Sequence, residues 1–459
     1  MPNSGQPSGR CWGPVARREF LQAGSLALGG TGLAEVLAGR ASAGKTDPTV
    51  DTSVILLYLH GGPSHLETYD LKPHAPVEYR SVYRPIRTNV LGLELCERFP
   101  QQARLANKIA IVRSLSHEMS SHSDGGIEVL TGKTPRVPDP TSQSKSEHPD
   151  LGSVVSHVRR TETVPPYVAI PRSTYMTRPA YLGLQHGAFV VPDPSAPGYR
   201  PPIGRLAAGL DGRRLADRKF LQSQLDRFRT SVDVAGEIKG VDHFRQQAFQ
   251  VLASSKTAAA FDLEQEPEDL RRVYGHHLWG QSCLLARRLC QAGVGVVSLY
   301  IDTPKTGPKF TNWDDHVLNA GRPGHFATFM DRRLPYLDQA LSALISDIYS
   351  KELDQQIMVV VMGEFGRTPR LSQNAQGVGR NHWPQAYSVL FSGGGLKTGQ
   401  VVGATNDKGE YPTERPYSPR DVLATIYRHL GIDGGQMLRD HAGRPVAILN
   451  DGRPIPELI

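Results

Sequence analysis

The chain has 459 residues, of which 39% are hydrophobic and 21% are charged. This composition excludes a disordered or collagen-like protein, because it supplies enough apolar side chains for a large core. The formal net charge is +7, but the first 43 residues alone hold four arginines against two acidic residues. The remaining excess of basic residues is small and scattered, so we expect no nucleic-acid partner.

Residues 1–43 have the pattern of an export signal. Arg17 and Arg18 precede an apolar stretch over residues 26–34, and a small-residue cleavage pattern ends at Ala43. This pattern is typical of a twin-arginine signal, which is an address read by a receptor. The apolar stretch is too short to span a bilayer. We therefore expect a periplasmic or secreted bacterial protein, exported by the twin-arginine machinery without a stable membrane span, with its mature domain over residues 44–459.

Six apolar runs of strand length follow in chain order, at 54–59, 109–112, 167–170, 294–301, 357–362 and 387–391. Runs without polar alternation are typical of strands that are covered on both faces. Helical patterns lie between them, for example at 334–353 and 421–430. Strands that alternate with helices predict a mainly parallel sheet, and we therefore predict a three-layer α/β/α fold.

Two segments differ from this alternation. Residues 136–150 are rich in Pro, Ser and charged side chains, which predicts a surface loop. Residues from about 205 to 290 have long amphipathic patterns and predict a helical insertion. Within that segment Cys283 and Cys290 are seven residues apart, so we expect them to share a buried helix face as small apolar side chains.

Chemically active side chains follow several of the apolar runs. The carboxyl ends of parallel strands meet at one edge of a sheet, where open α/β folds bind ligands. Four segments bring such residues to that edge: His60 after the first run, Ser121, His122 and Ser123 after the second, Asp314 and His316 after the 294–301 run, and Glu364, Arg367 and His382 after the 357–362 run.

Imidazoles and carboxylates together are the usual ligands of a divalent cation such as zinc or manganese. Such a cation polarises phosphoryl or sulfuryl oxygens and lowers the pKa of bound water. Arg367 is the candidate for holding the substrate anion, because a guanidinium binds two oxygens of a phosphate or sulfate at once. The alternative for this arginine is a structural ion pair.

Other enzyme classes lack their motifs. No GxSxG is present, so a serine hydrolase has no nucleophile elbow. Gly132-Lys133-Thr134 lacks the earlier glycine of a phosphate-binding loop, because that position is Ile127. No GxGxxG follows a strand, which disfavours a dinucleotide-binding oxidoreductase.

A set of motifs spread over nearly the whole chain resembles one bacterial family. The motifs are HGGPSH at 60–65 with DLKP at 70–73, GQSCLLARRL at 280–289, WDDH at 313–316, GEFGRTP at 363–369 and GRNHWP at 379–384. Together with the export signal they resemble the family called domain of unknown function 1501. That family is similar in fold to alkaline phosphatases and sulfatases, which implies an alkaline-phosphatase-like fold and an ancestry among metal-dependent ester hydrolases.

The resemblance carries over unevenly to single residues. The superfamily has a metal-binding carboxylate after its first strand, where this chain has His60. Its nucleophilic Ser or Thr corresponds to His122, with Ser121 and Ser123 beside it. Its later Asp-His pair is replaced by Gly363 and Glu364.

Other positions agree better with the superfamily. His382 matches a late single histidine ligand, and Asp314 with His316 resembles the pair that completes one metal site. The Cys-x-Pro-x-Arg signature of formylglycine sulfatases is absent. Three alternatives remain for the centre: His122 is a ligand or a nucleophile, Ser121 or Ser123 is the nucleophile, or catalysis has been lost.

The sequence therefore predicts an exported, metal-dependent hydrolase of sulfate or phosphate esters. The expected ligands of the divalent metal (zinc, manganese or calcium) are His60, His122, Asp314, His316, Glu364 and His382. The expected catalytic residues are His122, Ser121, Ser123 and Arg367. The substrate would be a small anionic ester or a sulfated or phosphorylated glycan. The alternative is a non-catalytic periplasmic binding or assembly protein that retains the fold.

Overall fold

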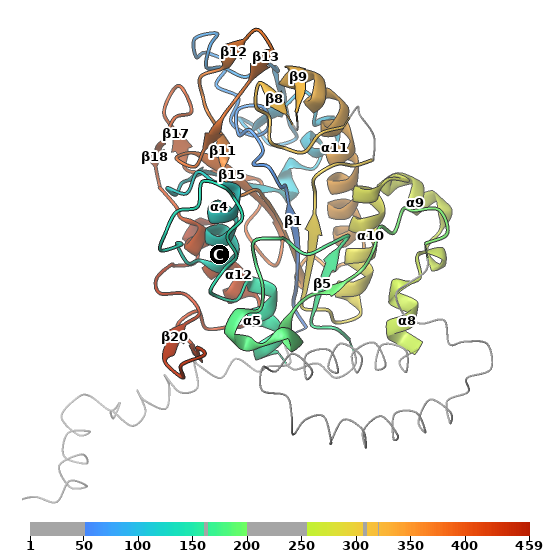
Figure 1. Cartoon of the computed structure of the whole chain (residues 1–459). Helices are drawn as coiled ribbons and strands as arrows, with labels where there is room; N and C mark the ends of the chain where they lie inside the picture. The colour runs from blue at the N-terminus through green and yellow to red at the C-terminus, as the bar shows by residue number, and fades with distance from the viewer. Residues whose placement is uncertain (1–50, 160–163, 200–254, 306–309, 320) are drawn as a thin grey trace, which may run out of the picture. The chain divides into compact units, whose positions relative to one another are not determined.

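The computed structural model describes residues 51–159, 164–199, 255–305, 310–319 and 321–459 (Figure 1). The expected export signal lies outside these residues, as does the part of the expected helical insertion before residue 255. No helix of the described ranges is both long and apolar enough to cross a membrane.

A mainly parallel sheet forms the centre of the described part of the chain. Its strands are β1 (Ser53–Tyr58), β4 (Ala110–Leu115), β5 (Tyr167–Ile170), β6 (Phe189–Val190), β7 (Val296–Tyr300), β10 (Ile357–Met362), β15 (Tyr387–Gly393) and β16 (Gln400–Val402). Their spatial order is β16-β4-β15-β10-β1-β7-β5-β6. Only β15 runs against its neighbours β4 and β10 among these eight. The six apolar runs of the sequence thus all become strands of one sheet.

Helices cover both faces of this sheet (Figure 1). On one face lie α10 (Leu278–Gln291) and α11 (Phe326–Ser350), and on the other lie α4 (His122–Thr131), α5 (Leu151–Val158) and α12 (Pro419–His429). Shorter helices are α3 (Pro100–Ala103), α8 (Ser255–Phe261) and α9 (Glu268–Tyr274). The 3-10 turns are η1 (Ala106–Lys108), η2 (Ala180–Leu182), η3 (Leu184–His186), η4 (Leu263–Gln265) and η5 (Pro456–Leu458).

The continuous apolar runs are explained by the two faces of the sheet. In β1, Ile55 and Leu57 pack with α10 and α11, whereas Val54 and Leu56 pack with α4, α5 and α12. Because successive side chains of a strand point to opposite faces, a strand covered on both faces needs apolar residues at every position. β10 follows the same rule, and all six of its residues are buried.

Smaller sheets lie outside the central sheet. Among the described residues, four of them are two-stranded: β2 (Pro85–Arg87) with β3 (Glu94–Cys96), β11 (Gly366–Arg367) with β14 (His382–Trp383), β17 (Ala404–Thr405) with β18 (Pro412–Glu414), and β19 (Met437–Arg439) with β20 (Pro445–Ala447). A separate four-stranded sheet contains β8 (Leu318–Asn319), β9 (Arg322–His325), β12 (Ser372–Asn374) and β13 (Gly377–Gly379). The pair β11 and β14 matters most for the site, because it sets Arg367 opposite His382.

Three local expectations can be compared with the structure. Residues 136–150 contain neither helix nor strand, as expected for a loop. The described end of the 205–290 segment is helical, and its last helix, α10, packs on β1 and β7. Cys283 and Cys290 are both buried and free within α10, which confirms their role as small apolar side chains.

Candidate metal centre

The carboxyl ends of three adjacent strands meet at the middle of the sheet. β1, β7 and β10 end in register, with Tyr58 beside both Tyr300 and Met362. The chain beyond each strand then supplies a chemically active side chain: His60 after β1, Asp314 and His316 after β7, and Glu364 after β10. The expected convergence at one sheet edge is therefore observed.

Local backbone geometry brings these loops together. Gly61 has φ +115°, and its N–H donates a hydrogen bond of 2.8 Å to Oε1 of Glu364. A Cβ at this position would lie 2.4 Å from the backbone nitrogen of Asp314. Glycine is thus required here both for the positive φ and for the close approach of two loops.

His122 comes from the other side of the centre, as the first residue of α4. Ser121 is the N-cap of that helix, and its hydroxyl accepts a hydrogen bond of 3.3 Å from the N–H of Asp124. A capping serine fixes where the helix begins. The cap therefore also fixes the position of the His122 side chain.

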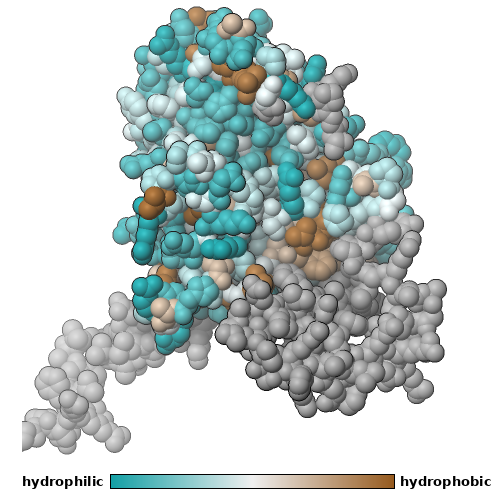
Figure 2. Space-filling view, viewed as in Figure 1, coloured by the Kyte–Doolittle hydropathy of each residue, from teal (hydrophilic) through white to brown (hydrophobic). Residues whose placement is uncertain are grey.

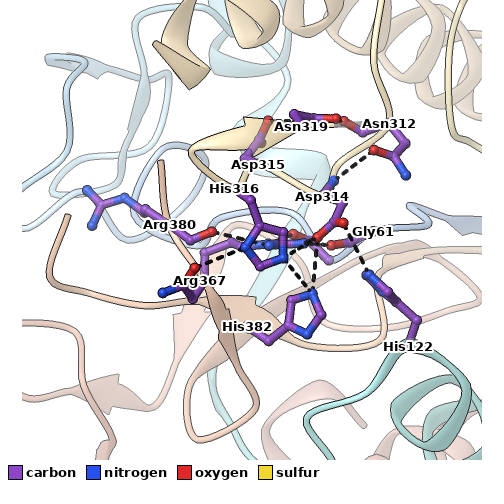
Figure 3. Close-up of polar contacts among 12 residues, drawn as sticks. Gly61, His122, Asn312, Asp314, Asp315, His316, Asn319, Arg367, Arg380 and His382 are labelled. Carbon is purple, nitrogen blue, oxygen red and sulfur yellow. Dashed lines mark hydrogen bonds and ion pairs between the residues drawn. The ribbon is translucent and has the colours of Figure 1, made fainter. Parts of the chain in front are cut away.

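Asp314 lies at the centre of the cluster, with three imidazoles turned toward its carboxylate (Figure 3). Nε2 of His316 lies 2.9 Å from Oδ1 and Nε2 of His382 lies 3.1 Å from Oδ1. Nε2 of His122 lies 3.4 Å from Oδ2. The two Nε2 atoms of His316 and His382 are 3.0 Å apart.

The other nitrogen of each of these imidazoles binds an acceptor of the protein. Nδ1 of His382 lies 2.6 Å from the carbonyl oxygen of Ser120, and Nδ1 of His316 lies 3.0 Å from Oδ1 of Asn381. A carbonyl oxygen only accepts, so Nδ1 carries the proton in both rings. Nε2 of each of these two rings then faces the carboxylate of Asp314. His122 has the same orientation, with Nδ1 at 2.6 Å from Oε1 of Glu364.

Glu364 lies beneath the imidazoles as a buried carboxylate with no exposed surface. Burial alone would raise the pKa of Glu364, but His60 and His122 outweigh that effect and lower its pKa to about 2. Burial alone would lower the pKa of His122, yet its hydrogen bonds to Asp314 and Glu364 raise that pKa to about 9. Glu364 is thus an ionised acceptor that holds the ring of His122.

Asp314 is also ionised. Burial alone would raise its pKa, but Arg367 and the surrounding imidazoles hold the pKa well below its usual range. Its side chain remains 23% exposed, and those of His316 and His382 are 30% and 21% exposed. The cluster is therefore accessible from solvent.

Arg367 contacts Asp314 from the buried side and does not reach the solvent-exposed part of the site. Its side chain has no exposed surface, and its guanidinium contacts the carbonyl oxygens of Gly61, Gly62 (2.9 Å) and Arg380 (3.2 Å). Nη2 also lies 2.5 Å from Oδ1 of Asp314. Each nitrogen of the guanidinium already binds the chain, so this geometry does not favour the expected role of Arg367 as an anion clamp. It matches the alternative, a structural ion pair.

His60 lies at one side of the cluster against a group of aromatic rings. Its Nδ1 is buried without a hydrogen bond among the described residues, 3.6 Å from Oε1 of Glu364. The ring centroid of Tyr300 lies 5.0 Å away and that of Tyr175 lies 5.7 Å away. The guanidinium of Arg172 lies over Tyr300 at 4.5 Å, and this arginine side chain is 58% exposed.

The two candidate serines are placed differently from the imidazoles. Ser123 is fully buried, and its hydroxyl lies 3.5 Å from Oδ1 of Asp124. Ser121 serves as the helix cap, 3.5 Å from the hydroxyl of Ser123. Within the described ranges, no hydrogen bond joins either hydroxyl to the imidazole–carboxylate cluster. The structure thus favours neither serine as the reactive group.

His122, Asp314 and His382 satisfy a geometric condition for a shared cation. One donor atom from each of these residues lies within 4.8 Å of the others. For bonds of about 2.1 Å to zinc, neighbouring ligand atoms lie about 3.0–3.4 Å apart, which agrees with the distances between Asp314 and the imidazoles. An imidazole ligand commonly donates its second N–H to a carboxylate or carbonyl. The donor set therefore fits a transition metal.

Sequence reasoning missed several contributors to this site. The Ser120 carbonyl and Asn381 orient two imidazoles, whereas Tyr300 and Arg172 flank His60. Asn381 adjoins His382 in one quoted motif, and Tyr300 is the last residue of β7, within the 294–301 run, so position alone could have indicated both. The Ser120 carbonyl could not have been found in this way, because every residue has a backbone carbonyl and the residue type does not show which one binds an imidazole.

A family profile described as "Protein of unknown function (DUF1501)" matches residues 51–459. The chain belongs to the DUF1501 family. No curated protein matches this DUF1501 chain.

Solved structures show remote similarity to the DUF1501 chain. PsFucS1 sulfatase from Pseudoalteromonas sp. is 10% identical, with a TM-score of 0.38 over 91% of this chain and 72% of that one. The lipoteichoic acid synthase LtaP from Listeria monocytogenes is 10% identical, with a TM-score of 0.34 over 87% of this chain and 79% of that one. TAB5 alkaline phosphatase is 10% identical, with a TM-score of 0.34 over 83% of this chain and 98% of that one.

Proposed function

We propose that the chain is a metal-dependent hydrolase of sulfate or phosphate esters with an alkaline-phosphatase-like fold. One observation carries this proposal: His122, His316 and His382 each bind a protein acceptor through Nδ1 and turn Nε2 toward the carboxylate of Asp314. Oriented imidazoles around an ionised, solvent-accessible carboxylate are the arrangement that a catalytic divalent cation requires.

The donor types favour zinc or manganese over calcium, because calcium takes oxygen ligands almost exclusively. His122, Asp314, His316 and His382 would hold the cation. When bound, it would polarise an ester oxygen and lower the pKa of a water molecule. Glu364 would orient His122, and Arg367 would orient Asp314, so both are positioning residues in this proposal.

Arg172 is our candidate for the group that holds the substrate anion. Unlike Arg367, it is largely exposed, and its guanidinium lies over Tyr300 next to His60. Its ion pair with Asp302 orients the guanidinium. An Arg172→Ala variant is expected to raise the KM for an aryl phosphate or aryl sulfate with little change in kcat. An unchanged KM would remove Arg172 from substrate binding.

Zinc titration and turnover test the hydrolase proposal directly. Wild-type protein is expected to bind zinc or manganese stoichiometrically and to hydrolyse an aryl sulfate or an aryl phosphate. Asp314→Asn and His382→Ala are expected to lose both metal and turnover while they stay folded, although Asp314→Asn lowers the melting temperature because it removes the carboxylate partner of Arg367. His74→Ala is the matched control, because His74 is an exposed histidine away from the cluster. Metal binding and turnover that persist in both cluster variants would contradict the proposal.

A second candidate function is a non-catalytic periplasmic binding or assembly protein. It is favoured by the contact between Arg367 and Asp314, since a buried guanidinium already neutralises the carboxylate at the centre of the cluster. This candidate predicts no stoichiometric metal after the purified protein is incubated with zinc, manganese or calcium. Metal analysis therefore separates the two functions.

We also propose export by the twin-arginine machinery. Its support is the sequence pattern of Arg17 and Arg18 ahead of an apolar stretch. Replacement of both arginines by lysine is expected to leave the protein in the cytoplasm of a host that exports the wild type. Fractionation of the cells gives the result, and periplasmic accumulation of the lysine variant would contradict the proposed route.

A further inference from the structure

A large cavity lies at the opposite end of α4 from His122. Its volume is about 1610 Å³, which exceeds the usual size of a site for one small molecule. Its walls come from segments within 132–137, 144–148, 178–185 and 440–451. None of the residues of the imidazole–carboxylate cluster lines it.

Basic side chains outnumber acidic ones in this cavity. The basic residues are Lys133, Arg136, Lys145, Arg178, Arg420 and Arg444, and the acidic residues are Glu147, Asp440 and Asp451. Two of the acids are already paired, Asp440 with Arg444 at 2.7 Å and Asp451 with Arg420 at 3.1 Å. Four basic side chains therefore face one remaining acid, Glu147, and the cavity has a net positive charge.

Three of these basic side chains can bind a ligand. Arg136 and Lys145 are exposed, and neither makes an ion pair within the described part of the chain. Arg178 donates a hydrogen bond of 2.8 Å from Nε to the Ser146 carbonyl, which orients its terminal nitrogens. Lys133 is different, because its ammonium is buried and held by Ala447 and Asn450.

The available cations come from two wall segments that are distant in the chain. Arg136 and Lys145 lie nine residues apart in the loop between α4 and α5, and Arg178 precedes η2. Three cations spread along two segments of the wall of a large cavity favour a ligand with several anionic groups over a single small anion. Guanidinium groups bind tetrahedral oxyanions through two hydrogen bonds at once.

Rings also line the cavity and suit a ligand with an apolar face. Tyr181 is packed edge-on against His148 at 5.8 Å and His441 at 6.3 Å between ring centroids. A tyrosine offers an apolar ring and a hydroxyl that hydrogen-bonds, which suits an amphipathic ligand. Figure 2 shows that the surface over the region of α4, α12 and β20, at the lower left, is mainly hydrophilic.

We propose that this cavity binds an oligosaccharide that carries several sulfate or phosphate ester groups. Arg136, Lys145 and Arg178 bind the anionic groups, and Tyr181 contacts a sugar ring. The proposal does not depend on the metal centre, because no residue of that centre lines the cavity.

Isothermal titration calorimetry with defined oligosaccharides tests this binding site. The probes are a heparin-derived hexasaccharide and a phosphorylated oligomannose, and the tighter one identifies the anionic group. Wild type is expected to bind one of them at physiological salt. The triple variant Arg136→Ala, Lys145→Ala, Arg178→Ala is expected to bind it at least tenfold more weakly. Failure of wild type to bind either probe overturns the proposal.

A matched control separates this cavity from general charge attraction. The triple variant Arg84→Ala, Arg87→Ala, Arg104→Ala removes three exposed arginines and the same net charge. It is expected to keep wild-type affinity, and an equal loss in both triple variants overturns the proposal. Inorganic sulfate is expected to bind far more weakly than the hexasaccharide, and equal affinity would mean a single-anion site and overturn it too.

The Asp314→Asn variant separates this proposal from the proposed hydrolase function. It is expected to bind the oligosaccharide as tightly as wild type, even though it is expected to lose metal. Loss of oligosaccharide binding in this variant would place the ligand at the metal centre and overturn the proposal. If both proteins bind the oligosaccharide but wild type does not hydrolyse the aryl esters, only the hydrolase proposal is rejected.

Discussion

Nδ1 of His122 lies 2.6 Å from Oε1 of Glu364, although the two residues are 242 positions apart in the chain. The carboxylate is fully buried, so it orients the ring without access to solvent. A buried acceptor behind an imidazole fixes which ring nitrogen is free to bind a cation. This pair is therefore the link between the fold and the proposed chemistry.

Glu364→Gln tests that link. The glutamine still accepts hydrogen bonds from Gly61 and His122 but lacks the negative charge that makes the His122 ring a stronger ligand. We expect zinc affinity to fall about 10–100-fold, as measured by competition with a chelating dye, and the free energy of unfolding to fall as well, because a buried ion pair loses one charge. Wild-type affinity in this variant would show that Glu364 does not act through His122.

Arg367→Met tests the structural role of the buried guanidinium. The change leaves the Asp314 carboxylate and three carbonyl oxygens without their donor. Removal of one partner from a buried ion pair costs about 3–5 kcal/mol in the free energy of unfolding, which urea denaturation measures. Arg87→Met is the control at an exposed arginine. Equal stability of the two variants would reject the positioning role of Arg367.

Gly61→Ala separates backbone strain from steric collision. Gly92 is the matched control, since it also has a positive φ (+78°) but has open space around the position of a Cβ. Gly92→Ala is expected to lose about 1–2 kcal/mol of unfolding free energy through strain alone. Gly61→Ala is expected to lose more and also to weaken zinc binding, because its Cβ displaces Asp314. Equal losses and unchanged zinc affinity would contradict this interpretation.

The sheet could be predicted from the sequence because buried strands leave a strong signal. β5 and β10 have the expected bounds, and the other expected strands are displaced by only a few residues. The helix expected at 334–353 begins earlier, at Phe326, because Phe329 and Met330 extend its buried face beyond Pro335. Local patterns therefore identified the elements better than their ends.

The meeting of the candidate ligands could also be predicted, because parallel strands place their carboxyl ends at one edge. The role of Arg367 could not. Whether an arginine faces solvent or carbonyl oxygens depends on how the turn at Gly61 and Gly62 packs against it, and residue type does not encode that packing. The acceptor of His382 was equally hidden, since it is the backbone carbonyl of Ser120.

His277 gives a pH-dependent prediction away from the metal centre. It is 4% exposed and is the N-cap of α10, where it accepts a hydrogen bond from the N–H of Gly280. Burial, assisted by Lys305, lowers its pKa to about 4. Between that value and the unfolded pKa of about 6.5, the unfolded chain binds a proton that the folded chain does not. His277 therefore destabilises the fold as the pH falls through this window.

His277→Asn isolates this contribution, because asparagine caps a helix but does not titrate. Above pH 7 the two proteins are expected to differ little in the free energy of unfolding. As the pH falls from 6.5 toward 4, wild type is expected to lose up to about 3 kcal/mol more than the variant, at 1.36 kcal/mol per unit of pKa shift. Urea denaturation across this range measures the difference. Parallel stability curves for the two proteins would mean that His277 is protonated equally in the folded and unfolded chains, and its buried capping role would be rejected.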